Sequence, residues 1–472
     1  MLGSGPVRLM ALMAVSCMAG VTDSVMSPYL CPEVRAKTGS QQAGLCGLMI
    51  SARFGTHILL ILVWAGLMAR LGARLILVTS VMVCGLANMA LASVVLVSNT
   101  QTFTILTFVL LIVSMIGDSG VFSSVYVLAG QTVLTSSPKT DSNTRMRMSG
   151  PAWIETLYGV GSMLGPPVGG LIYVKLGFGG VIFVAGVFMV VVSTINWVIL
   201  FRAQAGPDQS GPEDPSISDE QAESLCDDDH YDTEVEVSGE DGSASVKDLS
   251  YCDILSNPVI LSCCLLQVSS GMMSSWHLSS LQSHLADTMT LSTGHIGLVY
   301  MSQSLVYTCL CPLIGFLLDR HQHRLPFLII GVLANILGYS LLGPSSLLTR
   351  VQPHVALTVT GLMLIGVGQA TCLITCLTLM LASIKDSAKE SNAAKVNSYN
   401  DNDNEISNDY YQVTSVWECC EMVGGYLGSS LGGLAVDNIG FREASNIVVG
   451  MEVVIITLLI PFSVLLSQRF QR

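Results

Sequence analysis

The chain has 472 residues, of which 51% are hydrophobic and only 12% charged, whereas about 25% of residues are charged in soluble domains. With a mean hydropathy of +0.60 and many apolar runs of about 20 residues, this composition excludes a soluble domain and predicts a polytopic helical membrane protein. The net charge of −13 has one source, because the segment 203–248 holds 15 Asp/Glu and one Lys. The remaining chain is close to neutral, so we expect no nucleic-acid partner.

The apolar runs predict an all-α membrane protein with 12 transmembrane helices. The first six are expected at about 7–30, 43–68, 75–98, 103–130, 151–174 and 179–201. The other six are expected at about 257–280, 294–318, 325–344, 355–384, 411–436 and 444–466. The segment between the two sets is rich in Ser, Asp, Glu, Gly and Pro and too poor in apolar residues to fold. We therefore expect an N-terminal six-helix bundle over 1–202, an acidic disordered linker over 203–252 and a C-terminal six-helix bundle over 253–472.

A glycine-rich stretch occurs once in each predicted half, at 153–178 and again at 417–441. The equivalent pairs lie 263 positions apart: Glu155 and Glu418, Gly161 and Gly424, Gly165 and Gly428, Gly169 and Gly432, Gly170 and Gly433. Glycines spaced by four residues share one helix face, and small residues allow membrane helices to approach closely. The repeat predicts that the two bundles are pseudo-symmetric.

The two copies of this stretch also differ. Pro166 and Pro167 in the first copy predict an interrupted backbone ladder and a bend, but Ser429 and Ser430 replace them in the second. The second copy gains another acid, Glu421. We expect the first copy to supply the bend and the second to supply more of the charge that binds a cation.

The basic residues predict the orientation of the chain in the membrane. If both termini are cytosolic, fifteen Lys and Arg residues lie on the cytosolic side and five on the other. Basic residues concentrate in cytosolic loops. We therefore expect both termini and the acidic linker in the cytosol.

Most of the fourteen cysteines lie inside apolar runs, where they are expected to be small core residues. Cys372 and Cys376 share a helix face, but no His lies near them in the sequence, so we expect no metal site and no cofactor. Cys31 and Cys46 flank the first loop on the outer side. They either form a disulfide or remain two free thiols.

Several motifs resemble those of the major facilitator superfamily. The run from Gly315 to Arg324, which includes Asp319 and Arg320, is similar to the loop signature that the superfamily carries in each half. Its first-half copy is degenerate: Arg70 and Gly72 remain, but Ala69 stands where an acid is expected. A further resemblance is to the helix 5 motif associated with antiporters, carried by Gly161, Gly165, Pro166, Gly169 and Gly170. The helix 4 arginine motif of many proton-coupled members is not evident.

Finer features resemble the vesicular amine transporter family, and within it the vesicular polyamine transporter branch. These are the run from Pro28 to Pro32 that closes the first helix, Asp118, the pair Glu155-Thr156, and the run from Gly294 to Tyr300. His57 stands where that branch usually has a Glu in helix 2. The resemblance implies two six-helix bundles that rock about a central path lined by helices 1, 4, 5, 7, 10 and 11.

Charged residues inside predicted membrane helices are the candidate substrate or proton sites, because a charge at mid-membrane costs about 2.5–3.5 kcal/mol on insertion scales. The candidates are Asp23, Arg53, His57, Asp118, Glu155, Glu418 and Glu421. Glu418 and Glu421 are neighbours on one helix face, where two negative charges disfavour each other. Such a pair is expected to bind a cation or to hold protons.

Each candidate also has a structural reading. Asp23 either lines the cavity or is solvated near the outer end of its helix, and Arg53 either takes part in transport or only neutralises an acid. Glu155 and Glu418 either bind substrate and protons or make a symmetric hydrogen bond near the bundle axis. We expect Glu452 at a peripheral or loop-facing position.

The leading functional prediction is a proton-coupled antiporter of organic cations, amines or polyamines, working by alternating access in a vesicle or other endomembrane. Its partners would be a small cationic substrate, protons and the lipid bilayer. One alternative is a plasma-membrane efflux antiporter for drugs or other organic cations, and another is a non-transporting receptor or scaffold. The linker 203–248 is either a solvated tether or a site for cytosolic adaptors. No phosphate-binding loop, H-E-x-x-H motif or nucleophile elbow occurs, so we do not expect an enzyme.

Overall fold

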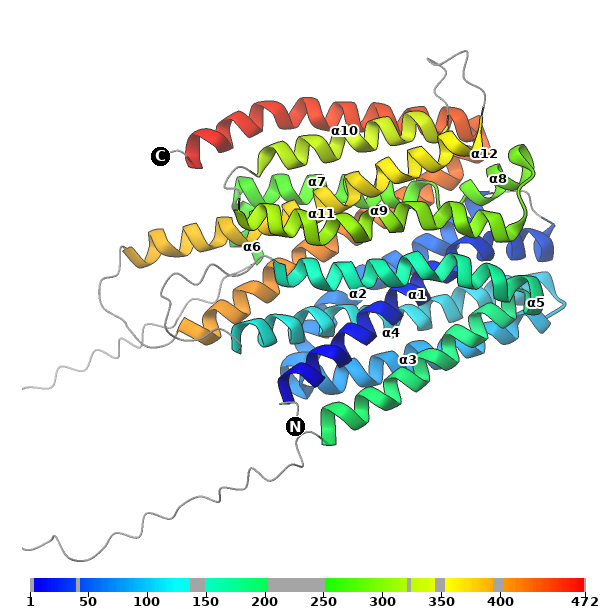
Figure 1. The fold of residues 1–472 in the computed structure, drawn as a ribbon, viewed down its shortest axis with the longest axis horizontal. Helices are drawn as coiled ribbons and strands as arrows, with labels where there is room; N and C mark the ends of the chain where they lie inside the picture. The colour runs from blue at the N-terminus through cyan, green and yellow to red at the C-terminus, as the bar shows by residue number, and fades with distance from the viewer. Residues whose placement is uncertain are drawn as a thin grey trace, which may run out of the picture.

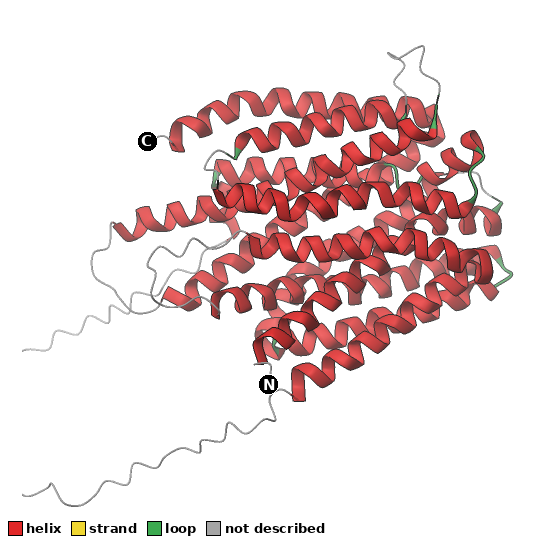
Figure 2. Cartoon of the chain, in the orientation of Figure 1, coloured by secondary structure: helices red, strands yellow, loops and turns green. Residues whose placement is uncertain are grey.

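The computed structural model describes residues 4–39, 43–135, 149–202, 251–320, 324–343, 353–393 and 402–470. Throughout these ranges the chain is helical, with short turns and no strand (Figure 2). Nine segments of the described chain are long and apolar enough to cross a membrane. Helices satisfy their own backbone groups, which a bilayer requires of a spanning segment. The predicted all-α membrane fold is confirmed.

The first half of the chain contains five long helices and a short 3₁₀ turn. They are α1 (Ser4–Thr38), α2 (Ala43–Leu71), α3 (Ala73–Ser93), η1 (Val94–Leu96), α4 (Thr100–Thr135) and α5 (Ser149–Arg202). The 54-residue α5 consists of two membrane helices that meet at Gly177, whose φ of 68° is not helical. This half therefore has six crossings.

The second half repeats this arrangement with two additional short helices. Its elements are α6 (Tyr251–Ser256), α7 (Pro258–Trp276), α8 (Leu281–Met289), α9 (Thr293–Arg320), α10 (Leu325–Leu342), α11 (Val355–Ala393) and α12 (Asn402–Phe470). α12 breaks at Gly440, where φ is 81°. Gly440 lies 263 positions after Gly177, and both positions need glycine because other residues rarely adopt a positive φ. The break between the last two helices of each half is thus the same feature repeated.

The two halves lie side by side, with α1–α5 in one layer and α7–α12 in the other (Figure 1). Both chain ends lie at one end of the bundle, which we call the terminal end. The opposite end, which we call the far end, holds the breaks at Gly177 and Gly440. Between the halves, α5 packs on α9 and α2 packs on α12.

The glycine-rich face packs within each half. A Cβ atom at Gly161 would overlap the carbonyl oxygen of Cys17 on α1, and one at Gly424 would overlap that of Val268 on α7. Gly165 and Gly428 meet the same two helices one turn farther along. The predicted close approach is therefore present, and its partner is the first helix of the same half.

A second set of glycines brings the two halves together toward the far end. A Cβ atom at Gly47 would overlap the carbonyl oxygen of Ser429, and one at Gly297 would lie 2.6 Å from that of Pro166. Gly47 and Gly297 lie 250 positions apart, and Pro166 and Ser429 lie 263 apart. Gly170 faces Gly294 across the same interface. The far end is thus closed by backbone contacts that occur twice.

The structure contradicts the expectation that Pro28 to Pro32 close the first helix, while the bend expected at Pro166 and Pro167 stays a prediction. The backbone of α5 stays helical through Pro166 and Pro167, and its break lies at Gly177. α1 likewise continues through Pro28 and Pro32 to Thr38 instead of closing there. A proline's fixed φ is compatible with a helix, and in membrane bundles neighbouring groups can satisfy the carbonyls that it leaves free.

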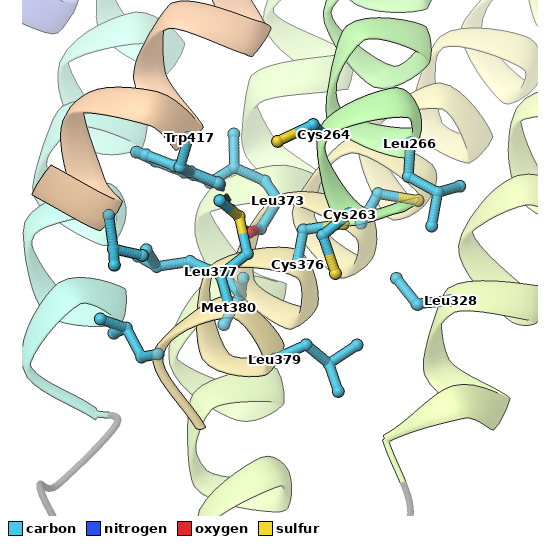
Figure 3. Packing of buried hydrophobic residues seen from close by; sticks show 14 of the residues in the cluster. Cys263, Cys264, Leu266, Leu328, Leu373, Cys376, Leu377, Leu379, Met380 and Trp417 are labelled. Carbon is cyan, nitrogen blue, oxygen red and sulfur yellow. Dashed lines mark hydrogen bonds between the residues drawn. The ribbon is translucent and has the colours of Figure 1, made fainter. Parts of the chain in front are cut away.

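The buried core of the second half is rich in sulfur, as Figure 3 shows for Cys263, Cys264 and Cys376 beside Leu373 and Trp417. These three cysteines are free and buried, as core residues would be. In the first half, Cys31 and Cys46 form a disulfide that joins α1 to α2 near the far end. The alternative of two free thiols is therefore wrong for this pair.

The loop motifs lie at the terminal end. Arg70 is exposed near the end of α2, and Gly72 follows it with a φ of 83°. Gly315 is buried in α9, Asp319 is half-buried, and Arg320 is the exposed last residue of that helix. The acidic linker lies outside the described residues, apart from 251–252 at the start of α6.

Candidate functional site

A cavity lies between the two halves and is lined by α1, α2, α4 and α5 on one side and by α7, α9, α11 and α12 on the other. The predicted path lacked the contributions of α2 and α9, the second helix of each half. Six of the seven predicted charged residues line the cavity: Asp23, His57, Asp118, Glu155, Glu418 and Glu421. The seventh, Arg53, contacts one of these acids directly.

The first-half wall of the cavity holds an ion pair. The Arg53 guanidinium lies 2.7 Å from the Asp23 carboxylate, and the Tyr158 hydroxyl donates a hydrogen bond of 2.8 Å to the other oxygen of that carboxylate. Asp23 lies near the middle of α1. Asp23 therefore lines the cavity and does not lie at a helix end, its side chain is 36% exposed, and Arg53 neutralises it.

Two buried side-chain hydrogen bonds at the cavity cross between the halves, and each ends on one of the repeated glutamates. His57 Nε2 on α2 lies 2.7 Å from Glu418 Oε1 on α12, and both side chains are buried. The Tyr307 hydroxyl on α9 donates to Glu155 Oε2 on α5. The repeated acids thus face each other's half of the molecule.

The second-half wall carries amides beside its acid. The Gln267 amide donates to Glu421 within this half, and the Gln303 amide donates to the Gln369 carbonyl oxygen at 3.3 Å. Glu418 and Glu421 are neighbours along α12, but one bonds across the halves and the other within its own half. Although Glu418 and Glu421 are neighbours in the sequence, they therefore have different hydrogen-bond partners.

Asp118 differs from the other acids of the cavity. It is 3% exposed, and its Oδ1 is buried without a hydrogen-bond partner. Arg53, His57, Asp23 and Glu418 all lie within electrostatic range of it. A buried carboxylate oxygen without a partner lacks a donor that it needs, so a cationic N–H group is a suitable occupant beside it.

Aromatic side chains narrow the cavity at both ends. Toward the terminal end, the rings of Tyr126 and Trp417 meet edge to face with centroids 5.8 Å apart. Toward the far end, the Tyr29 hydroxyl donates to the Pro166 carbonyl oxygen at 2.5 Å, and Tyr300 lines the cavity beside this contact. The cavity is therefore bordered by a contact between the halves toward the terminal end and by a contact within the first half toward the far end.

Several polar residues of the site are not predicted from the sequence, because an uncharged polar side chain in an apolar helix has no distinguishing pattern. They are Tyr158, Gln267, Gln303, Tyr307 and Gln369. The repeat contains a signal for two of them: Tyr307 lies 250 positions after His57, and Gln303 lies 250 after Arg53, the offset that relates Gly47 to Gly297.

The expectation for Glu452 is wrong. Its side chain is 1% exposed and accepts a hydrogen bond of 3.4 Å from the Asn335 amide, inside the second half. The carboxylate does not line the cavity. The Glu452 side chain points into the second half, and the sequence pattern of α12 does not distinguish this position from one on the outer face.

Comparisons with known proteins agree with this architecture. The sequence profile of the Major Facilitator Superfamily matches residues 12–401 and 263–469. The rat protein "MFS-type transporter SLC18B1" (Rattus norvegicus) is 23% identical over 440 residues, which cover 93% of this chain and 81% of the relative. Its mouse counterpart (Mus musculus) is 24% identical over 441 residues, with 92% and 81% covered.

Solved structures show the same fold at low identity. The nucleoside transporter NupG superposes with a TM-score of 0.62 at 11% identity, covering 95% of this chain and 97% of that one. A bacterial homolog to the human lysosomal transporter Spinster, in an inward-facing and unoccupied conformation, gives 0.61 at 12% identity, with 97% and 96% covered.

Proposed function

The chain belongs to the Major Facilitator Superfamily, and we propose that it is a proton-coupled antiporter of organic cations that carry more than one ammonium group, such as polyamines. Its family and its relatives are transporters, so the expectation that it is not an enzyme is confirmed. The substrate and the coupling ion are the proposed part.

The charge balance of the cavity carries this proposal. Five carboxylates line it, namely Asp23, Asp118, Glu155, Glu418 and Glu421, while the basic groups beside them are Arg53 and His57. Arg53 balances one acid. Four acids then remain beside His57, and such an excess of acids is costly in a membrane unless protons or a cation balance it. A cavity that holds protons and a multivalent cation in turn would exchange one for the other across the membrane, which is antiport.

The aromatic lining supports an organic cation over a metal ion. Phe122 and Tyr158 meet edge to face at 5.1 Å between centroids, and both line the cavity together with Trp417. Aromatic faces attract ammonium groups, and they also accommodate the methylene chain between them. The resemblance to vesicular amine transporters favours the same substrate class.

Two observations support an orientation with the terminal end in the cytosol. Basic residues concentrate on that side of the sequence, and the Cys31–Cys46 disulfide lies near the far end. Disulfides persist in lumenal and extracellular compartments and are rare in the cytosol. The far end then faces the lumen of a vesicle, or the exterior if the chain reaches the plasma membrane.

Uptake of radiolabelled spermidine into proteoliposomes with an acidic lumen tests the proposal. We expect accumulation that collapses when the pH gradient is dissipated. Glu155→Gln and Glu418→Gln should each lower uptake by about tenfold or more, because each removes an exchangeable charge from the cavity. Glu443→Gln is the matched control, since this exposed glutamate lies on α12 outside the cavity.

Three outcomes would contradict the proposal. Equal uptake by parent and both cavity variants would remove acid exchange from the mechanism. Gradient-driven uptake of hydrophobic monovalent cations but not of spermidine would favour a drug efflux antiporter. An absence of uptake for every amine, with the protein correctly assembled, would favour a receptor or scaffold.

A further inference from the structure

The two buried hydrogen bonds that join the repeated glutamates to the opposite half are the same contact made twice. Their acceptors, Glu155 and Glu418, lie 263 positions apart, and their donors, His57 and Tyr307, lie 250 apart. The same two offsets relate the backbone contacts of Gly47 with Ser429 and of Gly297 with Pro166. Each half therefore places one residue of its second helix on the glutamate of the opposite half.

The two contacts differ in the chemistry of the donor. The Tyr307 hydroxyl donates to Glu155, and a phenol keeps its proton at physiological pH. An imidazole gains and loses a proton in this range. His57 contacts Glu418 through one ring nitrogen and has a second that can accept a proton, whereas the Tyr307 hydroxyl offers no second basic atom.

His57 has a second nitrogen that faces no protein partner. Its Nδ1 is buried and without a hydrogen bond, as is Oδ1 of Asp118. The two residues lie on helices that pack together, and Phe122, one turn after Asp118, meets the His57 ring edge-on at 5.9 Å between centroids. Both side chains line the cavity. Two buried polar atoms without partners beside the cavity indicate a site for a donor from outside the protein.

We propose that His57 Nδ1 and Asp118 Oδ1 form a subsite for one ammonium group of the substrate, and that a proton on His57 expels this group. The inference rests on the proposed function and adds to it the residue at which proton and substrate exclude each other.

The exchange balances in charge. With substrate bound, neutral His57 donates its Nε2–H to the Glu418 carboxylate, and its Nδ1 lone pair and Asp118 Oδ1 both accept from the ammonium group. A proton from the far-end water then adds to Nδ1. The resulting Nδ1–H donates to Asp118, so the ammonium group loses both acceptors and leaves. The subsite carries a net charge of −1 before and after, with one proton taken up for one positive charge released.

The other charged groups around this subsite already have partners. They are Asp23 with Arg53 and Tyr158, Glu155 with Tyr307, and Glu421 with Gln267. They come from α1, α2, α5, α7, α9 and α12. Among the five cavity acids, Asp118 alone has a buried carboxylate oxygen with no hydrogen-bond donor in the described part of the chain, which favours an exchange beside His57.

The pseudo-symmetry supplies a conservative test, His57→Tyr. This variant copies the Tyr307 contact, so the fold and the contact with Glu418 should remain. We expect gradient-driven accumulation of spermidine to fall by about tenfold, within the usual range of coupling between linked sites, because the variant has no ring nitrogen to accept the ammonium group or the proton. Accumulation equal to that of the parent would overturn the inference and leave the proposed function intact.

A measurement without substrate separates the two proposals. Spin labels at Leu96 and Asn438, exposed residues near the far end of each half, report the distance between the halves. Attachment through a reactive non-natural amino acid avoids the native cysteines. We expect the distance distribution to change between about pH 8 and pH 5 in the parent, to stay constant in His57→Tyr, and to change further in Tyr307→His.

Each result of this measurement decides the matter. A parent that does not respond to pH, or a His57→Tyr variant that responds as the parent does, overturns the role of His57. If the parent responds and His57→Tyr does not, but no amine is transported, the proton site stands and the proposed substrate class fails.

Discussion

The two walls of the cavity are related by the repeat but differ in charge. The first-half wall has Arg53 and Asp118 where the second-half wall has Gln303 and Gln369, at offsets of 250 and 251. Asp23 on α1 likewise corresponds to Ser274 on α7. The first wall is therefore built from an ion pair and an acid, and the second from hydrogen-bonded amides.

The long helices reverse this pattern. Tyr158 on α5 corresponds to Glu421 on α12, 263 positions later. In the first half the hydroxyl of the long helix donates to an acid on α1, whereas in the second half the acid of the long helix accepts from Gln267 on α7. A polar contact therefore joins the first helix to the long helix in each half. The acid lies on the first helix in the first half and on the long helix in the second half.

The backbone packing between the same helices has not diverged. Gly20 and Gly161 hold α1 against α5, and Gly271 and Gly424 hold α7 against α12, with each Cβ position blocked by backbone atoms of the neighbour. A packing position in contact with backbone admits no side chain, but a cavity position does. The comparison shows that the two halves keep the same helix-packing glycines, whereas the side chains that line the cavity differ between them.

The largest effect is expected where the two halves are the same. Gly161→Leu and Gly424→Leu both force a side chain into the backbone of the neighbouring helix, as their Cβ positions are occupied. Overpacking usually costs about 1–3 kcal/mol, and a fixed backbone cannot yield as a side chain can. We expect little assembled protein from either variant, measured by fluorescence-detected size-exclusion chromatography.

Each half offers a control for this prediction. Gly66 on α2 and Gly450 on α12 have no atoms within 4 Å of a built Cβ, so leucine there should leave the yield unchanged. If Gly161→Leu assembled as well as Gly66→Leu, the packing role of the repeated glycines would be refuted. A loss in only one half would show that the two helix pairs do not depend equally on close approach.

A smaller effect is expected where the halves differ in charge. Arg53→Gln gives the first wall the residue of the second, but it leaves Asp23 without its cation. Breaking a buried ion pair costs about 3–5 kcal/mol, and the Asp23 side chain is 36% exposed, so we expect a loss of about 2 kcal/mol in the free energy of unfolding in detergent.

The double variant Arg53→Gln with Asp23→Ser copies both residues of the second wall. It should recover most of the lost stability, because no charge is left unpaired, yet remain impaired in spermidine uptake. A single variant as stable as the parent would show that the ion pair contributes nothing to folding. Failure of the double variant to recover stability would show that the wall depends on the pair for more than charge balance.

The sequence predicted the parts of this structure that depend on composition and spacing. The membrane crossings are predicted by the length of the apolar runs. The repeat is visible in the sequence because its glycines lie at close backbone contacts that admit no larger residue. The partners of the acids could not be predicted, since a hydrogen bond between His57 and Glu418 joins residues 361 positions apart. The end of the first helix was predicted wrongly at Pro28 to Pro32, because neighbouring groups in a membrane bundle can satisfy the carbonyls that a proline inside a helix leaves free. The roles of the site residues remain predictions.

The smallest effect is expected at Glu452, where the halves differ without reaching the cavity. Glu452 and Asn335 bond to each other in the second half, and the equivalent positions of the first half hold Met189 and Cys84, both fully buried. Replacing both partners of a buried hydrogen bond with apolar groups can be nearly neutral, whereas removing one leaves the other unpaired at a cost of about 1–3 kcal/mol.

The double variant Glu452→Met with Asn335→Cys should therefore unfold within about 1 kcal/mol of the parent, and Glu452→Met alone should be less stable than the double variant. Because neither residue lines the cavity, both variants should keep gradient-driven uptake per assembled molecule. Loss of uptake in a stable double variant would make Glu452 a second proton site, and the coupling would then not be confined to the cavity between the halves.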